Sequence, residues 1–183
     1  LLYRAVGQAA LRARKDPANE AAALAAALTI DIGTFGDEAL RSAEVGRASS
    51  VVAAHPKVRA ALLQFQQDFA AHPPAGKKGA VLDGRDIGSV VCPNATVKLF
   101  IIAGPEVRAH RRWLELKAKG STSSEAQVLA DLQERDARDA QRTDAPMKRP
   151  KGAHLLDTSD LSIEAAFAAA CAIIDDQLDR GAA

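Results

Sequence analysis

An α/β fold, with a parallel sheet flanked by helices, is the class that this chain of 183 residues predicts. Two short apolar runs support it. The run at 97–103 is continuous, β-branched and aromatic, and the run at 153–158 follows it after two helical segments. A third apolar run, at 80–83, is expected to form a further buried strand. Strands separated by helices are typical of parallel sheets that helices cover on both faces.

The first third of the chain is expected to be helical and to form a subdomain over one end of the sheet. Its signal comes from alanine-rich segments that have polar residues or proline at their starts. The predicted helices run from 1 to 15, from Pro17 to about Leu28 after an Asp16 cap, from an Asp37 cap to about Val52, and from Pro56 to about Phe69. A loop is expected at 71–79.

Three further helices are predicted in the rest of the chain. Their boundaries are indicated by residues that commonly begin or end helices. These boundaries are Pro105 and Gly120 for the first, a capping box of Thr122 and Glu125 for a helix that carries 133–142, and Ser162 with about Leu178 for the last.

Composition excludes several classes of function. The 24 basic and 23 acidic residues nearly cancel and aromatic residues make up 4%, so a nucleic-acid-binding surface is not expected. No apolar run approaches about 18 residues, the length of a membrane span. Cys92 and Cys171 lack the spacing of a metal site or a disulfide framework. We therefore expect one cytoplasmic domain, 1–183, without a membrane partner.

Three charges lie at the end of the predicted strand at 80–83, within the segment AVLDGRDIGS. In open α/β sheets ligands bind outside the carboxyl ends of the strands, which makes Asp83, Arg85 and Asp86 candidate site residues. Gly84 allows close approach of the backbone, and a carboxylate here can hold Mg²⁺ through its water shell. A polar turn with a local ion pair is the alternative.

The segment QERDARDAQR supplies a second charged set. On a helix, four of its residues fall within an arc of about 100°: Arg135, Arg138, Asp139 and Arg142. Arginine binds phosphate through two parallel hydrogen bonds, and a carboxylate accepts hydrogen bonds from sugar hydroxyls or exocyclic amines. This face is therefore a candidate nucleotide surface. A solvated face with pairs such as Glu134 and Arg138 is the alternative.

A third cluster consists of Arg108, Arg111 and Arg112 on the helix predicted after Pro105. These arginines could close over phosphates as a mobile lid and supply charge stabilisation only when substrate is bound. Ion pairs with Glu106 or Glu115 are the alternative.

Six segments, in order along nearly the whole chain, resemble bacterial cytidylate kinases, which are P-loop nucleoside monophosphate kinases. They are LYR at 2–4, ASSVVAAHPKVRAALL at 48–63, LDGRDIGSVVCPNATVKLFI at 82–101, PEVRAHRRWLELKAKG at 105–120, ERDARDAQR at 134–142 and LLDTSDLSIE at 155–164. The strings DGRDIG and ERDxRDxxR are specific to this family among such kinases.

The resemblance implies a P-loop NTPase-like fold, with a helical CMP-binding subdomain at about 30–75 and a lid at about 105–122. It also implies transfer of the γ-phosphoryl group of ATP to CMP or dCMP, with Mg²⁺, by a monomer. Phosphoryl transfer needs charge neutralisation and in-line placement of two phosphates more than titrating bases, and a chain with several clustered arginines suits that need.

The resemblance assigns roles to the matching positions. For the acceptor nucleotide, the residues that match the monophosphate-binding segment are Tyr3 and Arg4, and those that match further phosphate ligands are Arg85, Arg135 and Arg142. The residues that match cytosine contacts are Ser50, Arg59 and Asp86. Asp139 matches the carboxylate that binds the pentose hydroxyls. For ATP, the residues implied to bind the phosphates are the lid arginines Arg108, Arg111 and Arg112. The residues expected to assist the transfer itself are Arg85, Arg108, Arg112, Arg135 and Arg142, with Asp83 holding the metal through water.

Two departures from the family stand out. The phosphate loop G-x-x-x-x-G-K-[ST], with its preceding strand, is absent from the 183 residues, and we expect it upstream of Leu1. Without it the ATP phosphates lack their main cradle, so these residues alone are not expected to be active. The segment 30–42 is also shorter than the family's inserted region. A non-catalytic nucleotide-binding module, a UMP or AMP kinase and an RNA-binding domain are the alternatives.

Overall fold

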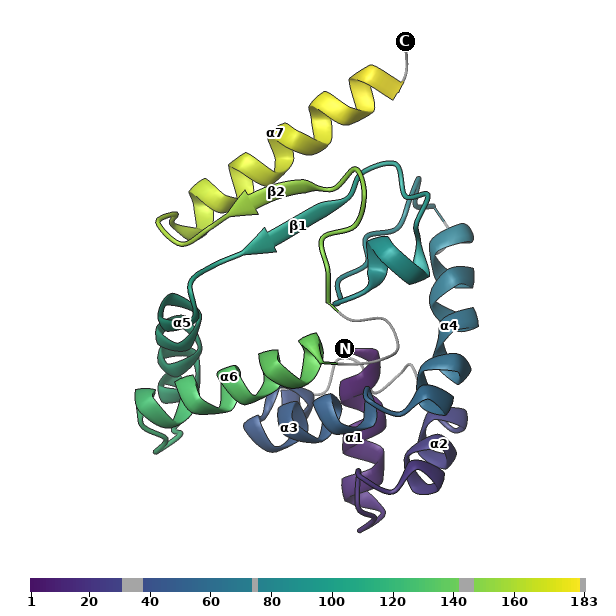
Figure 1. Ribbon diagram of the computed structural model, residues 1–183, viewed down its shortest axis with the longest axis vertical. Helices are drawn as coiled ribbons and strands as arrows, with labels where there is room; N and C mark the ends of the chain where they lie inside the picture. Colours follow the sequence, from purple (N-terminus) through teal and green to yellow (C-terminus); the bar gives the residue numbers. More distant parts are fainter. Residues whose placement is uncertain (31–37, 74–75, 142–146, 182–183) are drawn as a thin grey trace. The chain divides into compact units, whose positions relative to one another are not determined.

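The computed structural model describes residues 1–30, 38–73, 76–141 and 147–181. Over these residues the chain combines helices with a two-stranded parallel sheet, which confirms the α/β class (Figure 1). Its internal contacts divide the chain into two compact units. The first comprises Leu1–Asp83 and Arg138–Pro146, and the second comprises Gly84–Ala137 and Met147–Ala183.

The first unit is helical, as the sequence predicts for the first third of the chain. Its elements are α1 (Leu2–Arg12), α2 (Glu20–Leu28), the short 3₁₀ helix η2 (Glu38–Arg41), α3 (Ala43–Val52) and α4 (Pro56–Ala71). The core of the unit is built from small and branched side chains: Val6, Ala23, Ala27, Val52, Val58 and Leu62. Half-buried side chains, including that of Tyr3, pack against this core.

Helices α1 and α3 approach each other closely at Gly7. A Cβ atom on Gly7 would lie 2.9 Å from the backbone nitrogen of Ser49 and 3.1 Å from the Cβ of Ala48. Glycine in a helix interior usually costs about 1 kcal/mol relative to alanine. Here the missing side chain lets the two helix backbones touch, and the contact fixes α3 against α1.

The start of α2 differs from the prediction. Asn19, not Asp16, caps the helix, because the Asn19 side chain accepts a hydrogen bond from the Ala22 N–H at 3.0 Å. The carboxylate of Asp16 instead accepts from the Ala18 N–H at 2.9 Å and closes a turn before the helix. Both residues can accept from nearby N–H groups, and the helix follows the second of them.

A continuous helix from Asp37 to Val52 is also not observed. Asp37 lies outside the described residues, and α3 begins only after Ser42. The Ser42 hydroxyl accepts from the Val45 N–H at 3.2 Å, and its extended backbone separates α3 from η2. The expected single helix is therefore a 3₁₀ turn followed by a capped α-helix.

The second unit contains the sheet. Strands β1 (Leu99–Ile102) and β2 (His154–Asp157) pair in parallel, with Leu99 opposite His154 and Ile102 opposite Asp157. These strands confirm the predictions at 97–103 and 153–158. The helical elements of the unit are a π-helical turn η3 (Ile87–Val91), α5 (Pro105–Ala118), α6 (Glu125–Ala140), whose residues from Arg138 onward belong to the first unit, and α7 (Ile163–Gly181).

The strand expected at 80–83 is not formed. Within the described residues this segment pairs with no strand, and the side chain of Val81 is 95% exposed. A strand needs a neighbour for its backbone N–H and C=O groups, and an apolar run of four residues cannot supply one by itself.

Capping at the later helices is partly as predicted. Ser162 caps α7, since its hydroxyl accepts from the Ala165 N–H at 3.2 Å, and Gly120 ends α5 with φ +80°. The capping box of α6 is shifted by two residues from the prediction. It consists of Ser124, which accepts from the Gln127 N–H at 3.2 Å, and of Gln127, whose side chain accepts from the Ser124 N–H at 2.8 Å.

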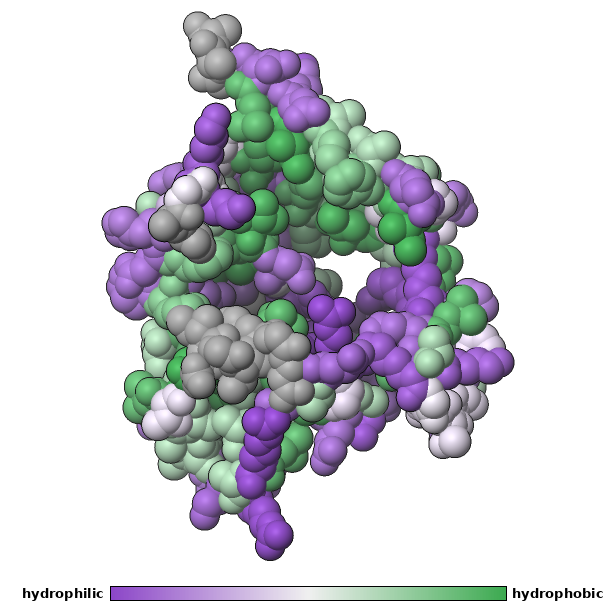
Figure 2. Space-filling view, turned by 180° about the vertical axis from the view of Figure 1, so that it is seen from behind, coloured by the Kyte–Doolittle hydropathy of each residue, from purple (hydrophilic) through white to green (hydrophobic). Residues whose placement is uncertain are grey.

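Apolar side chains lie exposed along α7 and β2 (Figure 2). Ile163, Phe167 and Leu178 of α7 and Leu155 of β2 belong to this set. Helix α7 contacts β2 and also carries exposed apolar side chains. Among the described helices, none has the length and apolar character needed to cross a membrane.

The close approach at Gly7 gives a stability prediction. Gly7→Ala should lower the free energy of unfolding by about 1 kcal/mol, because overpacking of about 1–3 kcal/mol exceeds a helix-propensity gain of about 1 kcal/mol. Urea unfolding followed by circular dichroism measures the change. Gly46→Ala is the matched control, because the three atoms nearest to a Cβ there belong to the Arg4 side chain, with Nη2 at 3.3 Å, and not to a helix backbone. Equal stability of the two variants would contradict the prediction.

Candidate functional site

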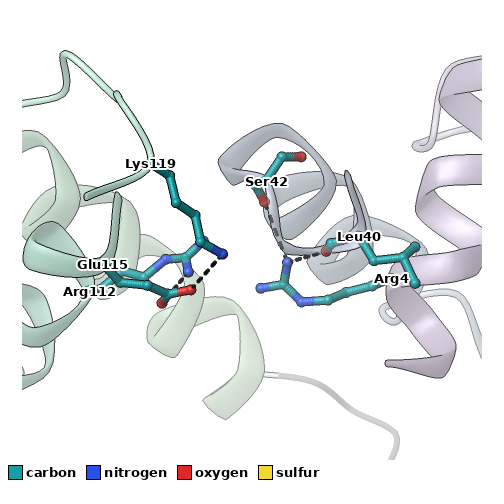
Figure 3. A network of polar contacts seen from close by, with 6 residues as sticks. All are labelled: Arg4, Leu40, Ser42, Arg112, Glu115 and Lys119. Carbon is teal, nitrogen blue, oxygen red and sulfur yellow. Dashed lines mark hydrogen bonds and ion pairs between the residues drawn. The ribbon is translucent and has the colours of Figure 1, made fainter. Parts of the chain in front are cut away.

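In the first unit, the guanidinium of Arg4 reaches the junction of η2 and α3. It donates to the backbone oxygens of Leu40 at 2.7 Å and of Ser42 at 3.4 Å (Figure 3). Arg4 therefore places a fixed positive charge beside the first turn of α3. A helix N-terminus also favours negative charge, so both features make this junction suitable for an anion.

Ser50 lies on α3 and is only 3% exposed. Its hydroxyl accepts a hydrogen bond of 2.8 Å from Nη1 of Arg138, which comes from α6 and belongs to the same unit. The preceding residue, Ser49, makes the usual local bond of a serine inside a helix, by donating to the Gly46 oxygen at 2.8 Å.

Two charged side chains of the first unit are deeply buried. Arg59 on α4 is 6% exposed, and Asp139 at the end of α6 is 1% exposed. Both take part in polar interactions within the chain. Burying a charge costs stability unless it is paired, so buried charges commonly mark functional sites. Asp139 is thus not part of a solvated helix face, which the sequence left open for 133–142.

The segment DGRD spans the boundary between the units, and its residues differ in exposure. Asp83, the last residue of its segment in the first unit, is exposed. In the second unit Arg85 is half-buried and Asp86 is buried, and both have polar interactions. The backbone oxygen of Asp86 accepts from the Val90 N–H at 2.8 Å and begins the turn η3. This turn fixes the Asp86 backbone at the start of η3.

Arg108 and Arg111 on α5 bind groups at the ends of the strands. Arg108 donates to the Ala103 oxygen at 3.0 Å and forms an ion pair of 2.7 Å with Asp136 of α6. Arg111 donates to the backbone oxygens of Thr158 at 2.6 Å and of Leu161 at 3.0 Å, which lie in the loop after β2. Both guanidiniums therefore brace the carboxyl ends of the two strands.

Arg112, on the same helix, is held differently. Its guanidinium forms an ion pair of 2.6 Å with Glu115, whose other oxygen lies 3.5 Å from the Lys119 ammonium (Figure 3). The hydrogen bond from Arg112, together with the charges of Arg112 and Lys119, lowers the pKa of the Glu115 carboxyl, although partial burial opposes this shift. One of the ion-pair alternatives raised by the sequence is thus present in the structure.

The two remaining candidates are on or beyond α6. Arg135 is half-buried on this helix and takes part in polar interactions. Arg142 lies outside the described residues. Asp136, the partner of Arg108, was not singled out from the sequence, although it stands inside the ERDxRDxxR string. The loop that Arg111 binds was also missed, because no local pattern links α5 to a loop about 50 residues later.

Comparison with known proteins finds relatives that match nearly the whole chain. A family model described as cytidylate kinase matches residues 1–176. The chain is 55% identical over 175 residues to the cytidylate kinase of Nitrobacter winogradskyi, covering 96% of this chain and 81% of the relative. It is 56% identical over 175 residues to that of Azorhizobium caulinodans, covering 96% and 82%. It is 54% identical over 173 residues to that of Rhodospirillum rubrum, covering 94% and 81%.

The helix-rich α/β structure and these matches define a nucleoside monophosphate kinase. More specifically, the chain belongs to the cytidylate kinase family. The resemblance drawn from the sequence motifs is therefore confirmed.

The Arg112 and Glu115 pair gives a prediction on pH. Because the pKa of Glu115 is lowered in the folded protein, the pair contributes to stability above the ordinary glutamate pKa of about 4.3. That contribution disappears as the pH falls through the lowered value, and it is small because solvent reaches the Glu115 side chain, which is 43% exposed. Arg112→Ala should raise the Glu115 pKa towards its ordinary value.

Carboxyl carbon shifts of Glu115, followed by NMR against pH, measure this pKa in each protein. Lys119→Ala is the matched control and should raise the pKa less, because the Arg112 hydrogen bond is the largest cause of the shift. An unchanged pKa in Arg112→Ala would show that the pair is absent in solution.

Proposed function

We propose that this protein transfers the γ-phosphoryl group of ATP to CMP or dCMP, giving CDP or dCDP and ADP. The observation that carries the proposal is the burial of Arg59 and Asp139 together with Ser50 in one unit, at positions where the family model also matches. Burying two charged side chains costs stability unless they are paired, and a binding role gives a reason to retain them.

The acceptor nucleotide is proposed to be held by neutral, cationic and acidic side chains. Ser50, Arg59 and Asp86 are assigned to the cytosine ring, and Asp139 is assigned to the pentose hydroxyls. A buried carboxylate suits the pentose, because it accepts hydrogen bonds and has no proton of its own to donate when ionised.

Arginines are proposed to neutralise the phosphates. Those assigned to the CMP phosphate are Arg4, with Tyr3 beside it, Arg85, Arg135 and Arg142, and those assigned to the ATP phosphates are Arg108, Arg111 and Arg112. Phosphoryl transfer gains most from positioning and charge stabilisation, and arginine keeps its charge at every working pH.

Magnesium is proposed to accompany ATP and to be held through water by Asp83. The described residues contain no cluster of three or more metal ligands, and Asp83 is an exposed carboxylate. This donor set fits Mg²⁺, which keeps several waters and binds through one or two carboxylates and substrate phosphates. When bound, the ion would neutralise phosphate charge.

The domain organisation, location and oligomeric state are proposed to be those expected for the family. We propose a single kinase domain over 1–183, with 30–75 as the CMP-binding subdomain and 105–122 as the lid. We further propose that it works as a cytoplasmic monomer on free nucleotides.

A coupled assay of ADP formation tests the proposed reaction. With the full-length gene product and ATP, kcat/KM for CMP and dCMP should exceed that for UMP and AMP by roughly 10²-fold or more, because a polar site rejects bases that leave its groups unpaired. Preference for AMP would identify a different kinase. Binding of CMP by calorimetry without any turnover would instead indicate a non-catalytic module.

Arg135→Ala should lower kcat/KM by roughly 10²- to 10³-fold while the melting temperature changes by only a few degrees, because one charge aimed at the reacting phosphates is removed. The matched control is Arg180→Ala on α7, whose side chain is 72% exposed and pairs with Asp176. That variant should keep full activity. A parallel loss of activity and melting temperature in Arg135→Ala would assign Arg135 a structural role.

A further inference from the structure

Ser50 and Ser49 are adjacent in α3, yet their hydroxyls are used differently. Both are buried, and Ser49 satisfies its hydroxyl locally by donating to the Gly46 oxygen at 2.8 Å. Ser50 is held instead from another helix, by the Nη1 of Arg138 at 2.8 Å, across 88 positions of sequence. A contact of this kind fixes a hydroxyl in relation to the fold and not only to its own helix.

The donor and the acceptor of this hydrogen bond are determined by chemistry. A guanidinium has only donors, so the Ser50 oxygen must be the acceptor. A hydroxyl has two lone pairs and one hydrogen, and Arg138 occupies one of the lone pairs. The rotation of the hydroxyl is thereby restricted, and the nearby positive charge makes its O–H a stronger donor.

We propose that Arg138 is a positioning residue for recognition of the base, acting through Ser50. This inference rests on the proposed function, in which Ser50 contacts the cytosine. A freely rotating hydroxyl can donate or accept, and so can satisfy cytosine or uracil, which differ in donors and acceptors at positions 3 and 4 of the ring. A hydroxyl that Arg138 holds in one orientation, as a donor, favours cytosine over uracil. This preference links Arg138 to specificity for the base.

The inference is tested by calorimetric binding to CMP, UMP and ribose 5-phosphate, which carries the same sugar and phosphate without a base. Arg138→Met should weaken CMP binding about tenfold and reduce the preference for CMP over UMP by a similar factor. Binding of ribose 5-phosphate should stay within about twofold, because the hydroxyl acts only on the base.

Four further variants separate positioning from a structural role. Ser50→Ala should match Arg138→Met, and the double variant should bind CMP no worse than either single variant, because both remove one contact. Arg138→Lys keeps a charged donor and should recover most of the preference for CMP. Ser49→Ala is the matched control and should bind like the wild-type protein.

Several outcomes would overturn the inference. Equal weakening of CMP and ribose 5-phosphate would mean that Arg138 acts on the phosphate, and additive effects of the two variants would mean that it does not act through Ser50. If Arg138→Met does not fold, Arg138→Gln, which is neutral and shorter, is measured in the same way. Wild-type protein that binds UMP or AMP as well as CMP would contradict the proposed function, whereas a normal preference kept in the Arg138 variants contradicts only this inference.

Discussion

The backbone contact between α1 and α3 at Gly7 is the constraint on which the first unit depends. Without a side chain at Gly7, the backbone at Ser49 comes within van der Waals distance of α1. Arg4 lies less than one turn before Gly7 on α1, and Ser50 directly follows Ser49 on α3. The contact that sets the spacing of the helices therefore also sets where these two candidate binding residues stand.

Long-range arginine contacts organise the second unit in a comparable way. Its sheet has only two strands in the described residues, so little backbone pairing holds the strand ends. Arg108 and Arg111 add hydrogen bonds to the oxygens of Ala103, Thr158 and Leu161. Charge-assisted bonds from a planar guanidinium can bridge several carbonyls at once, which lets α5 fasten both strand ends.

Much of the fold could be predicted from local signals. The errors arise where the outcome depends on parts of the structure that the local sequence does not determine. Pro56 and Pro105 mark the starts of α4 and α5 because proline suits the first turn of a helix. Caps were misplaced where two capable residues stand close together, as at Asp16 and Asn19, because the choice depends on how the preceding turn folds. The segment 80–83 has the composition of a strand, but pairing depends on a partner that composition does not reveal.

The candidate site was predictable in its residue types and less so in its contacts. Burial of Asp139 excludes a solvated helix face at this position, and burial is a tertiary property. The same holds for the Arg138 hydrogen bond to Ser50, since the spacing of charges on α6 indicates a shared face but not the helix that will meet it.

The three arginines on α5 that are proposed to bind ATP are each held by contacts within the fold. Arg111 would have to give up hydrogen bonds to Thr158 and Leu161, and Arg108 its bonds to Ala103 and Asp136. Arg112 is held by Glu115 in an ion pair whose side chains are 22% and 43% exposed, and partly exposed pairs contribute little to stability. Since Glu115 also lies near Lys119, its charge remains partly balanced when Arg112 leaves. The proposed role of these arginines on ATP therefore requires each of them to exchange contacts within the fold for phosphate.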